Sequence, residues 1–223
     1  MTMKRFKTWN IAAAIILCSC AWHSAEAKEL QEQGTSVEDI VPDGWLHHEA
    51  WGDLNKDGIK DLVVIVTPDD EEDIHRRDDG YVYNFNPPIL AIYFGNGQVL
   101  QLWKRYDYVI PPDQSENCSH DIVLEITSRS TLRIAISLFC NAGSYGTSTD
   151  TYTYRYQNGD FYLIGMDNEE MLRNTGEVTL VSENYLTWKR QVTRSNAFTD
   201  DPVTEKWSRL SKKPLEKLGE REL

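Results

Sequence analysis

The residues best suited to chemistry lie in one short loop, Asp53 to Asp61, where oxygen-bearing side chains stand mostly at alternate positions. Calcium takes about six to eight oxygen ligands, and calcium loops place a glycine at their sharpest turn, as Gly58 would be here. The loop therefore predicts a structural Ca²⁺ site built from side-chain oxygens and one backbone carbonyl. The expected ligands are Asp53, Asn55, Asp57, Ile59 (through its carbonyl) and Asp61.

A metal-free turn would use the same residue types, because Asp and Asn side chains close turns by accepting hydrogen bonds from nearby backbone N–H groups. An EF-hand is excluded, since the glutamate that it needs at the twelfth loop position is Val64 here. Residues 62–66 are apolar and mostly β-branched, which is typical of a strand covered on both faces. The sequence thus favours a calcium clip that runs into a buried strand and leaves the metal-free turn as the alternative.

The segment 52–66 resembles the loop-and-strand unit of FG-GAP and VCBS repeats, which use the loop as a calcium clip at the blade edges of β-propellers. Only one copy is present, so a full propeller, which needs at least about four blades, is not expected. The chain is more similar to small exported bacterial proteins of unknown function that carry a single such unit. That resemblance extends over residues 45–218 through a Gly/Ser-rich loop at 143–149 and a strand-turn-strand phrase at 154–165, and it implies a fold without an established activity.

The first residues read as an export signal. Basic residues at positions 4, 5 and 7 precede an apolar run at 11–17 that is too short to span a membrane. Cleavage after Ala27 would remove residues 1–27, whereas Leu17 to Cys20 resembles a bacterial lipobox, which would remove 1–19 and attach lipid to Cys20. We expect an exported protein, periplasmic or anchored in the outer membrane through Cys20, with secretion as the alternative.

The net negative charge of the chain limits the kinds of partner that it can bind. The chain has 223 residues and a formal net charge of −12, and removal of the signal would make it more negative still. Such a protein is repelled by nucleic acid and by anionic lipid surfaces, so any membrane attachment must come from the lipid. We therefore expect an envelope protein or a glycan as partner and no nucleic acid, and the oligomeric state stays open.

Two cysteines follow the signal, Cys118 and Cys140, and exported proteins live in oxidising surroundings. Both stand at the same sequence distance from Arg129, the centre of the turn-like segment 127–131, so they would face one another across a hairpin. This predicts a structural disulfide. A redox or metal role is the alternative, and the CxxC spacing of redox enzymes is absent.

The rest of the chain predicts a mainly β fold with few or no long helices. Short apolar or alternating runs are separated by turn residues such as Asn158-Gly159, as in an antiparallel meander or curved sheets of a partial propeller or a sandwich. We expect a polar linker at 28–44, a single β domain at 45–223, and a solvated charged loop at 69–80. The expected strands are 46–51, 62–67, 89–94, 99–106, 122–126, 132–139, 149–156, 161–166, 177–181 and 185–192.

Three functions from different classes fit these features. The first is a binding or envelope-associated module, and the second is an inhibitor or immunity-type protein that caps a partner. The third is a cell-wall or polysaccharide hydrolase, which would need paired carboxylates in an aromatic-lined cleft. The residues considered for the hydrolase are Trp103, Asp107, Glu125, Asp150 and Tyr152.

Overall fold

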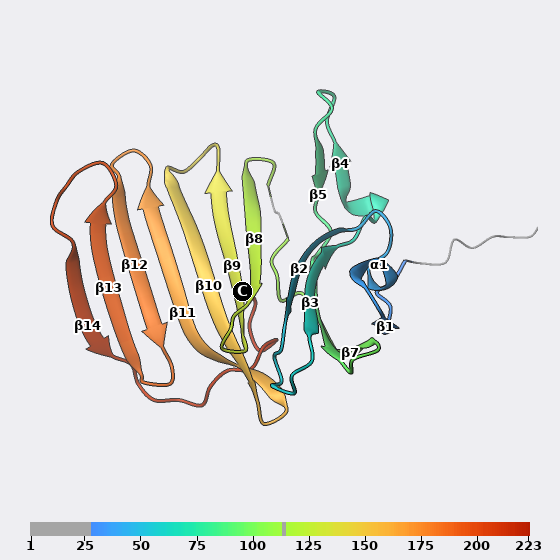
Figure 1. Ribbon diagram of the computed structural model, residues 1–223. Helices are drawn as coiled ribbons and strands as arrows, with labels where there is room; N and C mark the ends of the chain where they lie inside the picture. Colours follow the sequence, from blue (N-terminus) through green and yellow to red (C-terminus); the bar gives the residue numbers. More distant parts are fainter. Residues whose placement is uncertain (1–27, 113–114) are drawn as a thin grey trace, which may run out of the picture.

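The computed structural model describes residues 28–112 and 115–223, so the expected signal peptide and Cys20 lie outside the described residues (Figure 1). Within these ranges no helix has the length and apolar character needed to cross a membrane. The elements are β1 (Gln33–Gly34), α1 (Val37–Ile40), β2 (Leu46–Gly52), β3 (Asp61–Thr67), η1 (Glu71–Asp73), β4 (Ile74–Arg76), β5 (Val82–Asn84), β6 (Ile89–Gly95), β7 (Leu100–Asp107), β8 (Cys118–Ile126), β9 (Thr131–Cys140), β10 (Gly146–Gln157), β11 (Asp160–Leu172), β12 (Glu177–Asn184), β13 (Lys189–Asn196) and β14 (Thr204–Arg209).

The strands form antiparallel sheets, which confirms the mainly β prediction. A five-stranded sheet has the order β1-β7-β6-β3-β2 and curls into a half-barrel, and a seven-stranded meander has the order β14-β13-β12-β11-β10-β9-β8. In Figure 1 the two sheets stand side by side, and β2 lies next to β8. Gly52 marks this seam, because a Cβ added there would lie 2.4 Å from Cγ2 of Ile126. The remaining pair, β4 and β5, forms a separate hairpin.

Strand β3 is buried on both faces, as its apolar run predicts. Val63 and Ile65 join a core cluster with side chains of the meander, whereas Leu62, Val64 and Val66 join a second cluster with α1. Side chains alternate between the faces of a strand, so one run of residues serves both clusters. The five-stranded sheet is therefore the middle layer of the fold.

The prediction of a polar linker at 28–44 is wrong. Leu30, Val37 and Ile40 are 8%, 4% and 0% exposed, and β1 pairs with β7. Val37, Ile40 and Val41 have the spacing of one helical turn, and together with Leu30 they cover the outer face of β3. The segment belongs to the domain.

The meander is built from hairpins, and the residues in their turns have the backbone angles that those turns require. Asn158 and Gly159 have φ of 51° and 78°, the positive values that an Asn-Gly hairpin turn requires. Trp188 also has a positive φ of 56°. The strand expected at 185–192 begins only at Lys189, because residues 185–188 form the turn that precedes it.

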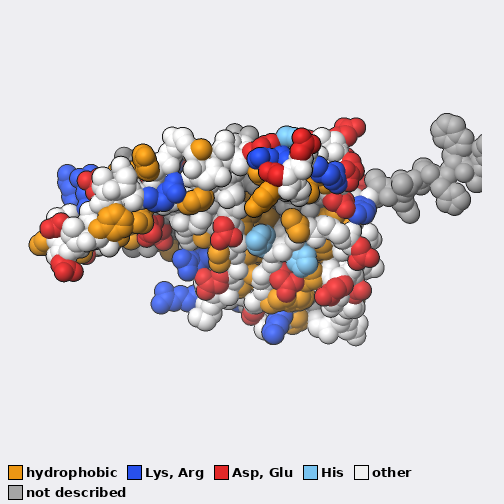
Figure 2. All heavy atoms as spheres, turned by 90° about the horizontal axis from the view of Figure 1, so that it is seen from above, with side chains coloured by type: hydrophobic (Ala, Val, Ile, Leu, Met, Phe, Trp, Pro, Cys, Tyr) orange, Lys and Arg blue, Asp and Glu red, His pale blue; other side chains and the backbone are white. Residues whose placement is uncertain are grey.

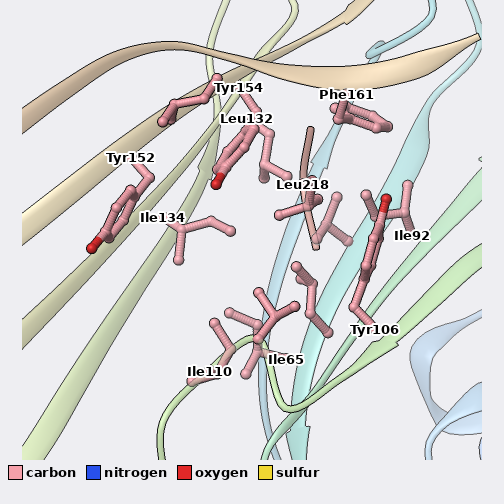
Figure 3. Close-up of a cluster of buried hydrophobic side chains, with 14 of the residues drawn as sticks. Ile65, Ile92, Tyr106, Ile110, Leu132, Ile134, Tyr152, Tyr154, Phe161 and Leu218 are labelled. Carbon is pink, nitrogen blue, oxygen red and sulfur yellow. The ribbon is translucent and has the colours of Figure 1, made fainter. Parts of the chain in front are cut away.

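The two ends of the meander differ in how they are covered. Beside the five-stranded sheet, Leu132, Ile134, Tyr152 and Tyr154 of β9 and β10 enter the core, so both tyrosines lie on the inward face (Figure 3). At the other end every residue of β14 is exposed. Figure 2 shows this end projecting from the body as a thin slab with Lys and Arg side chains on both sides.

The chain after β14 returns to the body; we call residues 210–223 the return segment. Leu163 N–H donates to the Glu216 carbonyl at 2.9 Å, and Leu218 N–H donates to the Phe161 carbonyl at 2.9 Å. Leu218 is 2% exposed within the core cluster. The segment thus closes the space between the two sheets at the base of the slab.

Candidate functional site

The Asp53–Asp61 loop is closed by hydrogen bonds of its own side chains. Asp53 Oδ1 accepts from Lys56 N–H at 2.6 Å, and Asp53 Oδ2 accepts from Gly58 N–H at 3.0 Å. Asn55 Oδ1 accepts from Asp57 N–H at 3.0 Å, and Asp57 Oδ1 accepts from Ile59 N–H at 2.8 Å. Each of these oxygens accepts a hydrogen bond from a backbone N–H, and these bonds hold the turns of the loop.

Asp61, the last expected ligand, points into the protein. Its side chain is fully buried and accepts hydrogen bonds from Leu54 N–H at 2.7 Å and from Gly95 N–H at 3.1 Å. Burial raises the pKa of Asp61, against the opposing effect of these two amides. Gly95 must be glycine, because an added Cβ would lie 2.2 Å from the Lys60 carbonyl oxygen. Asp61 therefore ties the loop to the end of β6.

The donor chemistry of the loop fits a hard cation only in part. Asp53, Asn55 and Asp57 are hard oxygen donors on an accessible loop, as Ca²⁺ requires. Within residues 28–112 and 115–223, however, no three His, Cys, Asp or Glu side chains converge as a metal cluster would. The outer part of the loop can offer oxygens to calcium, whereas the Asp61 carboxylate is already engaged by backbone amides.

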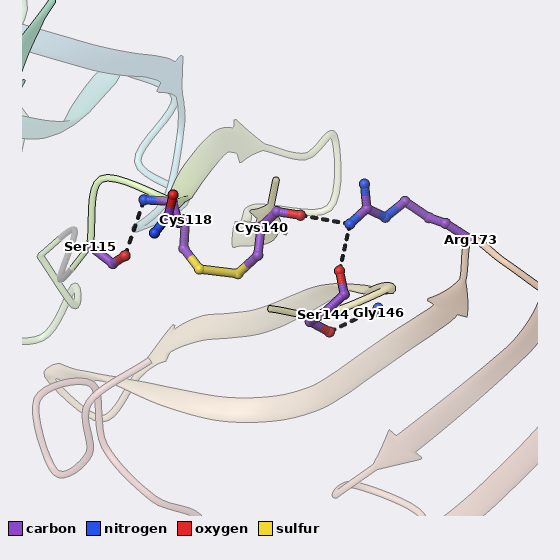
Figure 4. The surroundings of a disulfide bond; sticks show 7 residues. Ser115, Cys118, Cys140, Ser144, Gly146 and Arg173 are labelled. Atoms are coloured by element: carbon purple, nitrogen blue, oxygen red, sulfur yellow. Dashed lines mark hydrogen bonds between the residues drawn. A yellow bond between two sulfur atoms is a disulfide. The ribbon is translucent and has the colours of Figure 1, made fainter. Parts of the chain in front are cut away.

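The disulfide is present and has the predicted register. Cys118 and Cys140 stand opposite one another on β8 and β9, with a Cα–Cα distance of 4.1 Å. Arg173 packs beside the bond, where its Nη2 donates to the carbonyls of Cys140 at 2.6 Å and Ser144 at 2.8 Å (Figure 4). A cysteine in a disulfide is not a nucleophile, so the described structure gives this pair a structural role.

The residues considered for a hydrolase are not brought together. Glu125 pairs with Arg133 at 3.0 Å on one face of the meander, whereas Asp150 and Tyr152 lie on the opposite face. Asp107 is bound to Arg105, with an Oδ1–Nη2 distance of 2.7 Å. The rings of Trp103, Tyr156 and Phe161 pack against one another instead of lining a cleft. The described structure shows no facing pair of these carboxylates.

The segment expected to be a solvated charged loop is mostly exposed, and it contains a short hairpin that projects from the fold. Residues 69–85, which we call the arm, hold η1 and the β4–β5 hairpin, and Figure 1 shows the hairpin standing away from both sheets. At its base, the buried Asn86 donates from Nδ2 to the Asp70 carbonyl at 2.9 Å, and Asn84 Nδ2 donates to the Pro68 carbonyl at 2.7 Å. These bonds fix the direction in which the arm leaves the sheet.

Ion pairs and ring packing hold the arm along its length. Arg76 makes a two-pronged contact with Glu71, with N–O distances of 2.6 and 3.0 Å. Glu116, in the segment just before β8, lies 2.8 Å from His75 Nδ1 and 3.4 Å from Arg77 Nη1. The rings of Tyr83 and Phe85 lie nearly parallel, with centroids 6.1 Å apart. The hairpin is thus braced, although β4 and β5 pair only with one another.

The tip of the arm presents apolar surface to solvent beside charges of both signs. Tyr81 and Val82 are 68% and 58% exposed, directly after the turn at Gly80. Asp78 and Asp79 lie in the turn itself, where Asp79 pairs with Arg77 at 2.9 Å, whereas the acidic residues 69–73 lie at the base of the arm. Aromatic side chains on a fixed support are the usual anchors of protein interfaces. The sequence signal that would have found the arm is the β-type run 81–85, which the charged residues around it obscure.

A scan against protein-family models finds no match, and neither the curated proteins nor the solved structures that were compared give one.

Proposed function

We propose that this protein is an exported binding module of the bacterial cell envelope and that the arm is its contact with a partner. One observation carries this proposal: a braced hairpin holds Tyr81 and Val82 in solvent at its tip. Exposed apolar side chains on a fixed support lose little conformational entropy on binding. The exposed pair at the tip favours a partner whose surface has an apolar recess.

Two substitutions at equally exposed tyrosines test the proposal. The immobilised native protein, Tyr81→Ser and the matched control Tyr145→Ser are each incubated with envelope extract; Tyr145 is 67% exposed but lies outside the arm. We expect the native protein and the control to retain the same envelope protein and Tyr81→Ser to lose it. Equal retention by all three proteins would contradict a contact through the arm.

The shape of the arm also favours the inhibitor function. A narrow hairpin that stands clear of both sheets can enter a cleft that a flat surface cannot. If the retained protein is an enzyme, the native module should suppress its activity, and Tyr81→Ser should suppress it at least about tenfold less well, which corresponds to the loss of one interface anchor. An undiminished enzyme activity in the presence of the native module would leave simple binding as the function.

Calcium is proposed as a stabiliser of the loop, with Asp53, Asn55, Asp57 and the Ile59 carbonyl as the oxygens that it would use. Bound calcium would tie these groups together and raise the melting temperature. The native protein should therefore melt at a lower temperature with chelator than with Ca²⁺, and Asp57→Ala should abolish that difference. Asp78→Ala, in the arm, is the control that should keep it. A native melting temperature that is indifferent to chelator removes calcium from the proposal.

Anchoring through Cys20 completes the proposal for the envelope. The disulfide supports an oxidising compartment. Metabolic labelling with a tagged fatty acid should mark the native protein and Cys18→Ser, and it should not mark Cys20→Ser. Labelling of none of the three would favour cleavage after Ala27 and release without an anchor.

A further inference from the structure

The outer edge of β14 is an open strand edge at the tip of the slab. No described strand pairs with it, all of its residues are exposed, and none of them is proline. An open edge presents unpaired N–H and C=O groups that can pair with another strand. We propose that β14 pairs with β14 of a second copy of this chain, antiparallel about a twofold axis at Trp207, and that the protein forms a symmetric dimer.

The backbone phase of β14 is fixed by one hydrogen bond. Leu210 N–H donates to the Trp188 carbonyl at 2.9 Å, and these residues flank the facing pair of Lys189 and Arg209. That pattern makes Lys189 and Arg209 a non-hydrogen-bonded pair of the β13–β14 ladder. Arg209 therefore directs its own N–H and C=O outward, as do the residues two and four positions before it.

These outward groups are the ones that a twofold axis at Trp207 would use. Trp207 would face the Trp207 of the second copy, Glu205 would face its Arg209, and Arg209 would face its Glu205. All three would be hydrogen-bonded pairs. The same three side chains lie on one face of the sheet, because side chains alternate along a strand. Backbone donors, opposite charges and aromatic rings therefore coincide in a single register.

The side chains of β14 are complementary to themselves in this register. Glu205 meets an arginine, Lys206 meets Ser208, and Trp207, which is 59% exposed in the single chain, meets its own copy. Aromatic pairs and opposite charges directly across a strand pair are favourable. No two like charges stand directly opposite, which is the condition for a surface to bind its own copy.

The neighbouring registers with the same backbone phase fit less well. Moving the axis to Lys206 would place two lysines opposite one another at the short distance of a non-hydrogen-bonded pair. Moving it to Ser208 would lose the contact between Glu205 and Arg209. The charges of β14 thus select one register.

The fold leaves room for a second copy at this edge. β14 is the outermost strand of the slab, which projects away from the half-barrel and the arm in Figures 1 and 2. Directly after Arg209, Leu210 still bonds to Trp188, which precedes β13. The return segment then leads away from β14 to the body. The interface is therefore separate from the arm and leaves it accessible.

Charge reversal in the two partners provides the test. The native protein should have twice the single-chain mass by sedimentation equilibrium, while Glu205→Arg and Arg209→Glu should each have the single-chain mass because each places like charges opposite one another. An equimolar mixture of the two variants should recover the doubled mass. In the mixed dimer both pairs of positions 205 and 209 are an arginine facing a glutamate. Far-ultraviolet circular dichroism checks that both variants stay folded.

A native protein that remains a single chain up to its solubility limit would overturn the proposal. So would a dimer that persists in both single variants, because its interface would then lie elsewhere, or a mixture that fails to associate. The control is Arg129→Glu, the same charge change on the exposed β8–β9 turn, which should keep the doubled mass. Loss of the dimer in this control would attribute the effect to overall charge and would equally overturn the proposal.

Discussion

Strands β3 and β14 have similar lengths, seven and six residues, and opposite surroundings. Each side chain of β3 up to Val66 is buried between layers, whereas each side chain of β14 is exposed. β3 is held by its side chains as well as its backbone, while β14 is held almost entirely by its ladder with β13. The core therefore constrains the sequence of β3 and leaves the side chains of β14 free to meet other surfaces.

The largest expected effect follows from creating a cavity at β3. Ile65 is 1% exposed, and Ile65→Ala removes methyl groups from the core cluster that joins both sheets. We expect the free energy of unfolding to fall by about 2–5 kcal/mol, measured by urea denaturation. Val123→Ala, at a 57% exposed position of β8, is the control and should cost far less. Equal losses in the two variants would remove the distinction between buried and exposed strands.

The second effect concerns the disulfide between the start of β8 and the end of β9. Replacing Cys118 and Cys140 together by serine should lower the free energy of unfolding by about 2–4 kcal/mol, because the unfolded chain is no longer cross-linked. Reduction of the native protein should give a similar loss, and it should leave the double variant unchanged. A double variant as stable as the native protein would mean that the β8–β9 ladder alone fixes this edge of the sheet.

A smaller and pH-dependent effect is expected in the return segment, between the two regions. Hydrogen bonds from Lys213 and Arg221 hold the pKa of Glu216 below its ordinary value, against the effect of partial burial. A pKa lowered by folding stabilises the protein above the unfolded-state pKa, and this contribution is lost as the pH falls through the folded-state pKa. Glu216→Gln should therefore cost less than about 1 kcal/mol near neutral pH and nothing in strong acid.

Unfolding curves at several pH values check this expectation, with Glu222→Gln as the control. The difference between native protein and Glu216→Gln should shrink as the solution becomes acidic. A difference that stays constant with pH would show that the carboxylate acts through packing alone.

The smallest effect is expected at β14. Trp207→Ser, made in the single-chain background of Arg209→Glu, should change the free energy of unfolding by no more than about 0.5 kcal/mol, because the side chain packs on little. The measurement is urea denaturation of both proteins at equal concentration. A loss comparable to that of Ile65→Ala would mean that β14 contributes to the core after all.

The parts of the fold that the sequence predicts best are set by local chemistry. The pairing of Cys118 with Cys140 followed from their equal distance to a turn, and the Asn158-Gly159 turn followed from the backbone angles that these residues tolerate. The strand at 62–67 was recognisable because burial on both faces demands an unbroken apolar run. In each case the reason lies within a few residues of the pattern.

The parts that could not be predicted depend on contacts from elsewhere in the chain. Leu30 and Ile40 become core residues only because β3 offers them a face. β14 has no apolar period, since neither of its faces is covered, and the arm is braced by Glu116 from a distant segment. In the loop, the roles of Asp61 and Asp57 differ because only Asp61 meets the end of β6. A single sequence does not report such neighbours.

The return segment also bears on the order in which the molecule folds. Adjacent hairpins make the meander from contacts close in sequence, whereas Leu223 N–H bonds to the Val109 carbonyl far back in the chain, at 2.8 Å. Contacts of large sequence separation form slowly. We therefore expect the hairpins to form early and the return segment to pack onto the core last. Pulse-labelling hydrogen exchange during refolding checks this: the amides of Leu218 and Leu223 should gain protection after those of β9 and β10. Earlier protection of these two leucines would reverse the order.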